Sequence, residues 1–150
     1  MARVHSIFIS SRVGGGLEQR NSVKAVQFCG LEGDRYYRQH DTAPGNPNAV
    51  TLIDLEQVYQ CNSILQTSFS PQDFRRNIIT AEADLNSLVG RDFCVGSVTL
   101  RGFELCEPCR YISELLHADL LAGMALRGGL RAWIISGGTI EVDDLIAEQP

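Results

Sequence analysis

Short runs of hydrophobic and β-branched residues, separated by turn residues, recur along most of the chain. Such runs are typical of β-strands. Many short strands with few helices favour a closed or nearly closed barrel, because closure removes exposed strand edges. We therefore predict a mainly β fold, a β-barrel with a few short helices. The runs of strand length are Val4–Ile9, Val23–Phe28, Ala49–Ile53, Asn77–Thr80, Asp92–Val95, Val98–Leu105, Leu130–Ile135 and Thr139–Val142.

Two stretches have their apolar residues at helical spacing instead. The first runs from Leu55 to about Leu65, with Asp54 before it as an N-cap and Glu56 in its first turn. The second runs from Cys109 to about Met124, where leucine and isoleucine recur every three or four residues. The pattern thus predicts one helix in the middle of the chain and one before the last strands.

The length of 150 residues is that of one domain, and no repeat, low-complexity tract or linker divides the chain. We interpret residues 1–150 as a single domain. The one long irregular stretch, Gly30 to Asn48, is either a functional loop or a disordered one. The turn Gly14-Gly15-Gly16 lacks the Lys-Ser/Thr pair of a phosphate-binding loop.

The net charge of the chain limits the kinds of molecule that it is expected to bind. Thirteen basic and 18 acidic residues give a formal net charge of −5, which argues against general binding to nucleic acid or to a membrane surface. A local basic pocket is compatible with this charge. No apolar run has the length of a signal-peptide core or a membrane span, which predicts a cytoplasmic protein. In that reducing compartment the five cysteines are expected as thiols.

The strongest chemical signal is Cys106-Glu107-Pro108-Cys109, between a predicted strand and a predicted helix. Pro108 suits the first helical turn, which would place Cys109 near the helix N-terminus. Free N–H groups and the helix dipole stabilise a thiolate there, and Arg110 adds positive charge. Cys109 is therefore the candidate catalytic nucleophile, sulfur carrier or soft-metal ligand, with Cys106 as its helper. The alternative is a pair of buried, inert thiols.

Three kinds of chemistry compete for these two cysteines. Structural zinc requires about four ligands, and the other cysteines and histidines are scattered singly along the chain. A thioredoxin-like dithiol also opens a helix with CxxC, but only about 40 residues follow, and the strands do not alternate with helices. What remains is a single reactive thiolate that carries sulfur or binds a soft metal such as molybdenum.

Arginines at three places in the chain are candidates for an anion site. Two enter a predicted strand beside an asparagine, where guanidinium groups and a carboxamide can hold a phosphate and a planar heterocycle. Another follows a Gly-Asp turn at the head of the long irregular stretch, and one precedes the strand that starts at Leu130. Each also has an ordinary structural interpretation, as a strand entrance or a turn. The candidate cofactor-binding residues are Asp34, Arg35, Arg75, Arg76, Asn77 and Arg127.

The order and spacing of these motifs resemble those of the MOSC family, which is named after the C-terminal domain of molybdenum-cofactor sulfurase. The resemblance covers most of the chain. It rests on GDR at residues 33–35, FRRN followed by IIT at residues 74–80, LVGRDF at residues 88–93, CEPC at residues 106–109 and RGGL at residues 127–130.

The resemblance implies a β-barrel and a cysteine that carries persulfide sulfur or binds molybdenum, matched here by Cys109. It also implies a basic pocket for the phosphate of the pterin cofactor, where Arg75, Arg76 and Asn77 fall. Family members occur fused to desulfurase domains that depend on pyridoxal phosphate. This chain contains no such domain, so pyridoxal phosphate would act only through a partner cysteine desulfurase.

The leading hypothesis is a MOSC-domain protein that binds the molybdenum cofactor. It would act through Cys109, either as a sulfur carrier or as part of a molybdenum-dependent reductase of N-hydroxylated compounds, alone or beside a molybdenum-enzyme partner. One alternative is a non-catalytic module that delivers the cofactor to another protein. The other is a dithiol oxidoreductase that uses Cys106 and Cys109.

Overall fold

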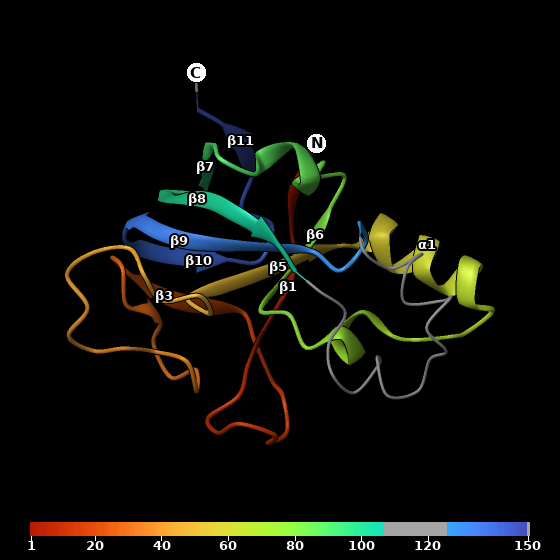
Figure 1. The fold of residues 1–150 in the computed structure, drawn as a ribbon, viewed down its shortest axis with the longest axis horizontal. Helices are drawn as coiled ribbons and strands as arrows, with labels where there is room; N and C mark the ends of the chain where they lie inside the picture. Colours follow the sequence, from red (N-terminus) through yellow and green to blue (C-terminus); the bar gives the residue numbers. More distant parts are fainter. Residues whose placement is uncertain (107–125, 150) are drawn as a thin grey trace.

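The computed structural model describes residues 1–106 and 126–149. In this part the fold is mainly β, as predicted, with a single α-helix and two short 3-10 helices (Figure 1). The strands are β1 (Arg3–Ile9), β2 (Glu18–Arg20), β3 (Ser22–Val26), β4 (Gly30–Leu31), β5 (Val50–Asp54), β6 (Ile78–Ala81), β7 (Asp92–Val95), β8 (Val98–Leu105), β9 (Leu130–Ser136), β10 (Gly138–Glu141) and β11 (Ile146–Glu148). The helices are α1 (Leu55–Leu65), η1 (Pro71–Phe74) and η2 (Leu85–Leu88).

All the predicted strands are present, but the sheets they form are open. The larger sheet has the order β11-β7-β8-β9-β5-β6-β1-β2, and the smaller has the order β10-β3-β4. The predicted closed barrel is not confirmed, because the edge strands β11 and β2 do not pair with each other. The larger sheet does curl back on itself, since Arg3 at the start of β1 bridges Leu145 just before β11.

Strand β5 lies between β9, with which it is antiparallel, and β6, with which it is parallel. Parallel neighbours require a crossover connection, and α1 provides it. Figure 1 shows α1 at one end of the molecule, away from β3. Every residue of β5 and β6 is buried. Their sequences are therefore nearly continuous hydrophobic runs, because both faces of these strands are covered.

Two clusters of buried side chains form the core. The larger fills the space between the two sheets and includes Ile7, Leu52, Phe93, Leu100 and Ile134. The smaller lies between the sheet and α1 and comprises Phe8, Ile53, Val58, Cys61, Phe74 and Ile79. The apolar face predicted from Leu55, Val58 and Tyr59 packs only in part: Val58 is fully buried and Leu55 packs against the cluster, whereas Tyr59 is 60% exposed.

Helix α1 begins and ends where the sequence predicts, because its cap is local. The Asp54 carboxylate accepts the N–H of Glu56 (3.0 Å), while the side-chain carbonyl of Gln57 accepts the N–H of Asp54 (3.0 Å). This reciprocal pair satisfies N–H groups that a helix start leaves without partners. Asp54 also accepts the Thr80 hydroxyl (2.6 Å), which ties the helix start to β6. The second predicted helix, from Cys109, lies outside the described residues.

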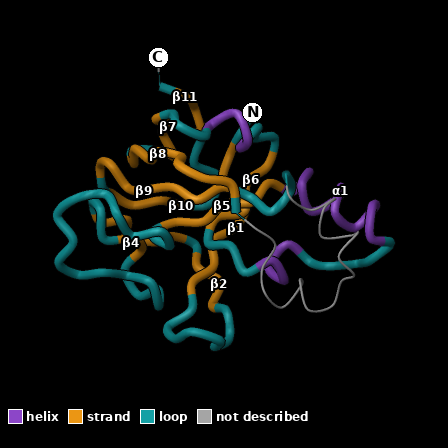
Figure 2. The backbone as a smooth tube through the Cα atoms, in the orientation of Figure 1, coloured by secondary structure: helices purple, strands orange, loops and turns teal. Residues whose placement is uncertain are grey.

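The irregular stretch between β4 and β5 is an ordered loop, which projects from the sheets in Figure 2. Asn46 is buried at its base, and its side-chain amide donates to the carbonyls of Cys29 (3.1 Å) and Tyr36 (2.7 Å). Its side-chain oxygen accepts the N–H of Asn48 (3.1 Å). One asparagine therefore ties the two arms of the loop together. No helix in the described part of the chain is long and apolar enough to cross a membrane.

Candidate functional site

The turn before β9 receives hydrogen bonds from three separate parts of the chain. The successive carbonyls of Arg127, Gly128 and Gly129 accept from the Cys61 thiol of α1 (3.8 Å), the Arg76 guanidinium (2.9 Å) and the N–H of Cys106 (2.8 Å). We call these three carbonyls and their donors the RGGL junction. It brings together three of the predicted residues, Arg76, Arg127 and the helper Cys106, and it lies where the chain leaves β8 towards Cys109.

Arg76 is the buried cation of the RGGL junction. Arg76 and Asn77 are the two residues directly before β6, and Arg76 is 7% exposed. A buried guanidinium is tolerated in a protein when its N–H groups are hydrogen-bonded. The Gly128 carbonyl accepts the hydrogen bond from Nε of Arg76. Arg127 lies at the edge of the same junction, where its Nε donates to the side chain of Gln60 in α1 (3.1 Å).

Arg75 points in another direction from Arg76. It ends the 3-10 helix η1 in the left-handed conformation, with φ of 59°. Its guanidinium donates from Nη2 to the carbonyl of Gly15 (2.9 Å), in the loop between β1 and β2. Among residues 1–106 and 126–149, no carboxylate forms an ion pair with Arg75. The two adjacent arginines thus face different surroundings, one buried at the RGGL junction and one half-buried beside a glycine-rich loop.

Asn77 uses its carboxamide to join two strands. Its side-chain oxygen accepts the N–H (3.1 Å) and hydroxyl (3.2 Å) of Thr51 in β5, and its side-chain NH₂ donates to the carbonyl of Phe8 in β1 (3.2 Å). β6 lies between these two strands. Asn77 therefore fills the gap just before β6 begins, which is a structural task. A further contact from its second NH₂ proton to a heterocycle stays a prediction.

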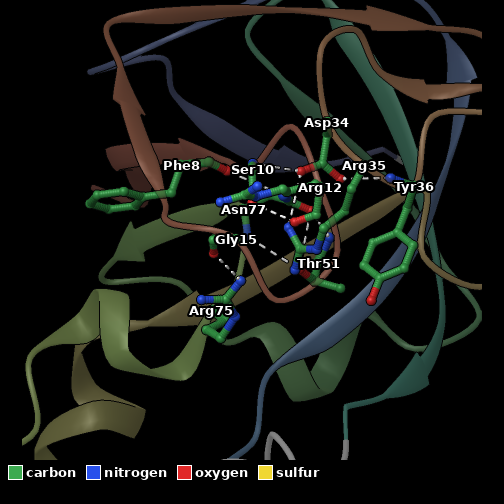
Figure 3. A network of polar contacts seen from close by, with 10 residues as sticks. All are labelled: Phe8, Ser10, Arg12, Gly15, Asp34, Arg35, Tyr36, Thr51, Arg75 and Asn77. Carbon is green, nitrogen blue, oxygen red and sulfur yellow. Dashed lines mark hydrogen bonds and ion pairs between the residues drawn. The ribbon is translucent and has the colours of Figure 1, made fainter.

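Asp34 and Arg35 form a buried ion pair close to Asn77 (Figure 3). The Arg35 Nη1 lies 3.2 Å from the Asp34 carboxylate, and their side chains are 9% and 2% exposed. The same carboxylate accepts the N–H of Ser10 at the end of β1 (3.0 Å), and the guanidinium stacks over the Tyr36 ring at 4.6 Å. This packing fixes a cation in one orientation, which favours recognition of an anion.

Burial raises the pKa of two of the described thiols, Cys61 and Cys106. Burial raises the pKa of the Cys106 thiol, which is 1% exposed, although Arg76 and Arg131 oppose the shift. Burial likewise raises the pKa of the Cys61 thiol to about 11, with Arg127 opposing. Because the thiolate is the nucleophilic form, neither is suited to start a reaction. The predicted nucleophile, Cys109, lies outside the described residues.

The raised pKa of Cys61 predicts a loss of stability in alkali. The unfolded thiol ionises near its ordinary pKa of 9.0, whereas the folded one keeps its proton until about 11. The folded state therefore holds more protons over this window, and the free energy of unfolding falls as pH rises from 9 to about 11. Urea denaturation at several pH values measures the slope. In Cys61→Ala the slope should be smaller, and equal slopes in the two proteins would contradict the assignment.

Two contributors to the site were not predicted from the sequence. Ser10 links β1 to both ends of the Asp34–Arg35 pair, because its N–H donates to Asp34 and its carbonyl accepts the N–H of Arg35 (2.7 Å). Arg131 in β9 lies 3.4 Å from Glu104 and donates to the side chain of Asn48 (2.5 Å). Neither residue has a local sequence signal, because its partners are distant in the chain.

Comparison with known proteins identifies the family of this chain. The sequence profile of the MOSC domain matches residues 39–147, which is well over half of the chain. The chain belongs to the MOSC domain family. This family is associated with binding of the molybdenum cofactor. The matched region of this MOSC domain includes FRRN, CEPC and RGGL, and thus both sides of the RGGL junction.

Solved structures similar to this MOSC domain share its fold at low sequence identity. YuaD from Bacillus subtilis has a TM-score of 0.75 at 14% identity, over 97% of this chain and 93% of its own. YiiM from Escherichia coli has a TM-score of 0.64 at 18% identity, over 99% and 68%. YiiM from Geobacillus stearothermophilus has a TM-score of 0.63 at 14% identity, over 100% and 76%. No functionally curated protein matches the sequence.

Proposed function

We propose that this MOSC domain binds the molybdenum cofactor and handles sulfur or molybdenum at Cys109. The observation that supports this most is the RGGL junction. There the buried Arg76 guanidinium and Cys106 meet at the turn before β9, and Cys109 follows Cys106 by three residues. Because burying a charge costs desolvation energy and apolar residues often pack as well, the buried cation beside the CEPC sequence favours a role beyond packing.

The described arginines fit the chemistry of a cofactor phosphate. Arg75 is half-buried and has no carboxylate partner among residues 1–106 and 126–149, so its charge is available to an anion. Arg35 contacts Asp34 through one nitrogen, and the five N–H donors of a guanidinium leave others for a ligand. Bidentate contacts from arginine to phosphate are strong and directional. Arg75 and Arg35 would therefore hold the phosphate, and Arg76 and Arg127 would support the turn beside it.

A thiolate at Cys109 could support either of two activities. As a sulfur carrier, it attacks the terminal sulfur of a donor persulfide: an S–S bond forms at Cys109, the donor S–S bond breaks, and the donor leaves as a thiolate. No net oxidation or reduction occurs, and Cys109 then holds the sulfur for an acceptor. In a reductase, the same thiolate would be a soft ligand, and bound molybdenum would pass two electrons from an external electron donor to an N-hydroxylated substrate, which takes up two protons and releases water.

The sulfur-carrier activity requires a supply of persulfide. We propose a partner cysteine desulfurase, which depends on pyridoxal phosphate, as the donor, and a molybdenum enzyme as the acceptor. Both partners would be cytoplasmic. The net charge of −5 suits protein partners better than nucleic acid or a membrane surface.

The first test is the molybdenum content of the protein purified anaerobically from a host that makes the cofactor. We expect near-stoichiometric molybdenum in wild-type protein and a clear loss in Arg75→Gln. Cys94→Ser, which changes a half-exposed thiol bonded to the side chain of Gln149, should retain the metal and is the control. Absence of molybdenum from wild-type protein would contradict the proposal.

Cys109→Ser then separates the two activities. If the thiolate is a metal ligand, molybdenum falls in this variant. If Cys109 carries sulfur, molybdenum stays, and mass spectrometry after incubation with a desulfurase and cysteine shows a 32-Da persulfide adduct on wild-type protein only. Retention of both metal and persulfide by Cys109→Ser would exclude a role for this residue and favour the delivery module.

A further inference from the structure

The loop between β1 and β2, residues 11–16, which we call the glycine loop, is held to the rest of the protein by few contacts. Within it, the N–H of Gly15 donates to the carbonyl of Arg12 (3.0 Å), which also accepts the Ser10 hydroxyl (2.9 Å). The side chain of Val13 at its tip is 71% exposed. β2 is an edge strand that pairs only with β1. Leu17, which follows the loop, packs against the smaller core cluster, whereas residues 11–14 and 16 are exposed, so the glycine loop itself gains little from packing.

Within residues 1–106 and 126–149, one long-range hydrogen bond ties the glycine loop to the body of the protein. The Arg75 Nη2 donates to the carbonyl of Gly15 at 2.9 Å, across 60 residues of sequence. Gly15 is buried by this contact, while its neighbours Gly14 and Gly16 are exposed. Figure 3 shows the Arg75 guanidinium directed at the carbonyl of Gly15. The arginine proposed to receive an anion is thus the residue that holds the loop.

The three glycines of the loop differ in backbone conformation and in the room that each leaves for a side chain. Gly14 has φ of +71°, which favours glycine. At Gly15 a Cβ would lie 2.6 Å from the Arg12 side chain and 3.0 Å from its carbonyl, so the closed turn leaves no room for one. At Gly16 nothing lies within 4 Å. The closed loop therefore requires glycine at its centre, and flexible glycines on both sides give it freedom to move.

An anion and the Gly15 carbonyl would compete for the same donor. A neutral carbonyl forms a weaker bond to a guanidinium than a phosphate-type oxyanion, which can also bind two nitrogens at once. An oxyanion that binds both terminal nitrogens of Arg75 takes Nη2, which is the nitrogen that the Gly15 carbonyl uses. Binding of an anion at Arg75 thus removes the main tether of the glycine loop.

We propose that the glycine loop is a strap that closes the anion site at Arg75 and is released when a phosphate-type oxyanion replaces the Gly15 carbonyl. This inference rests on the proposed function, because it describes the regulation of the same arginine. Ser10 connects the strap to the second cation, since its hydroxyl donates to the Arg12 carbonyl and its N–H to Asp34, the partner of Arg35.

The rate of trypsin cleavage measures how often the strap is open, because the Arg12–Val13 peptide bond lies in the exposed tip of the loop. Its cleavage rate tracks the population of the open loop. With saturating pyrophosphate we expect cleavage at Arg12 to rise about tenfold, since a hydrogen bond from a charged donor is lost. Cleavage at Arg38, exposed in the loop between β4 and β5, should not change and is the internal control. Inorganic phosphate and phenyl phosphate, run in parallel, distinguish a free phosphate from a phosphate ester.

Two variants test the tether without an added ligand. Arg75→Ala should be cleaved at Arg12 about tenfold faster than wild type, with no response to pyrophosphate. Gly16→Ala has room for its methyl group and stiffens the open chain, so it should be cleaved about two- to fivefold more slowly.

Equal cleavage of wild type and Arg75→Ala would overturn the strap, and so would an unchanged or slower rate with pyrophosphate. These outcomes leave the molybdenum content untouched. A protein that contains molybdenum but has a loop indifferent to anions would refute the strap alone, whereas a protein without molybdenum would refute the proposed function.

Discussion

Gly129→Ala is expected to unfold the protein or to reduce its free energy of unfolding by about 4 kcal/mol, near the upper end of single substitutions. A Cβ at this position would lie 2.0 Å from the carbonyl oxygen of Leu52 in β5, and φ is +103°, where side chains are strained. The Leu52 carbonyl cannot move away from the added methyl group, because β5 is held by β6 and β9 on its two sides. Urea denaturation, followed by far-UV circular dichroism, measures the loss.

Gly45→Ala is the matched control for this experiment. Gly45 lies in the loop between β4 and β5, nothing is within 4 Å of its Cβ position, and φ is outside the left-handed region. The same substitution should change the free energy of unfolding by less than about 0.5 kcal/mol there. A stable Gly129→Ala protein would mean that the turn before β9 does not approach β5 as described, and the RGGL junction would lose its support.

Asn77→Ala is expected to cost about 3 kcal/mol, because it leaves the Phe8 carbonyl and the Thr51 N–H buried without their partners. The loss comes from two neighbouring strands at once, so it should also speed hydrogen exchange at the start of β6. Asn86→Ala is the comparison: this exposed asparagine also has two partners, because it donates to the carbonyl of Leu126 (2.7 Å) and accepts from the side chain of Gln57 (3.1 Å), but water can replace its side chain. It should cost under about 1 kcal/mol. Similar losses in the two variants would show that Asn77 has no bridging role.

Local signals in the sequence were sufficient for α1 and for the strands with hydrophobic runs. Asp54 and Gln57 define the start of α1 within four residues of chain, so its boundary needed no tertiary information. The short strands β2, β4 and β11 were missed, because they contain two or three residues with no alternation of buried and exposed positions. The predicted barrel is not confirmed, since closure depends on whether two edge strands meet, and no local pattern encodes this.

The candidate site was predicted as a set of residues but not as an arrangement. Sequence identified Arg75, Arg76 and Asn77 together, yet their side chains contact a loop, a turn and two strands respectively. These partners lie between 26 and 69 residues away, and no motif encodes such a distance. The same reasoning explains why Asn46 was seen only as part of an irregular stretch, although it determines the order of the whole loop.

The pairing of β8 with β9 determines which part of the sequence can be exchanged without disturbing the sheet. Leu105 pairs with Leu130, and the N–H of Cys106 donates to Gly129, so the described chain before and after residues 107–125 is held together by the sheet itself. The cost of closing a loop grows slowly with its length, by about 0.6 kcal/mol for each doubling. Evolution, or a designer, can therefore exchange this segment and its cysteine for another of different length and chemistry while the supporting sheet stays as it is.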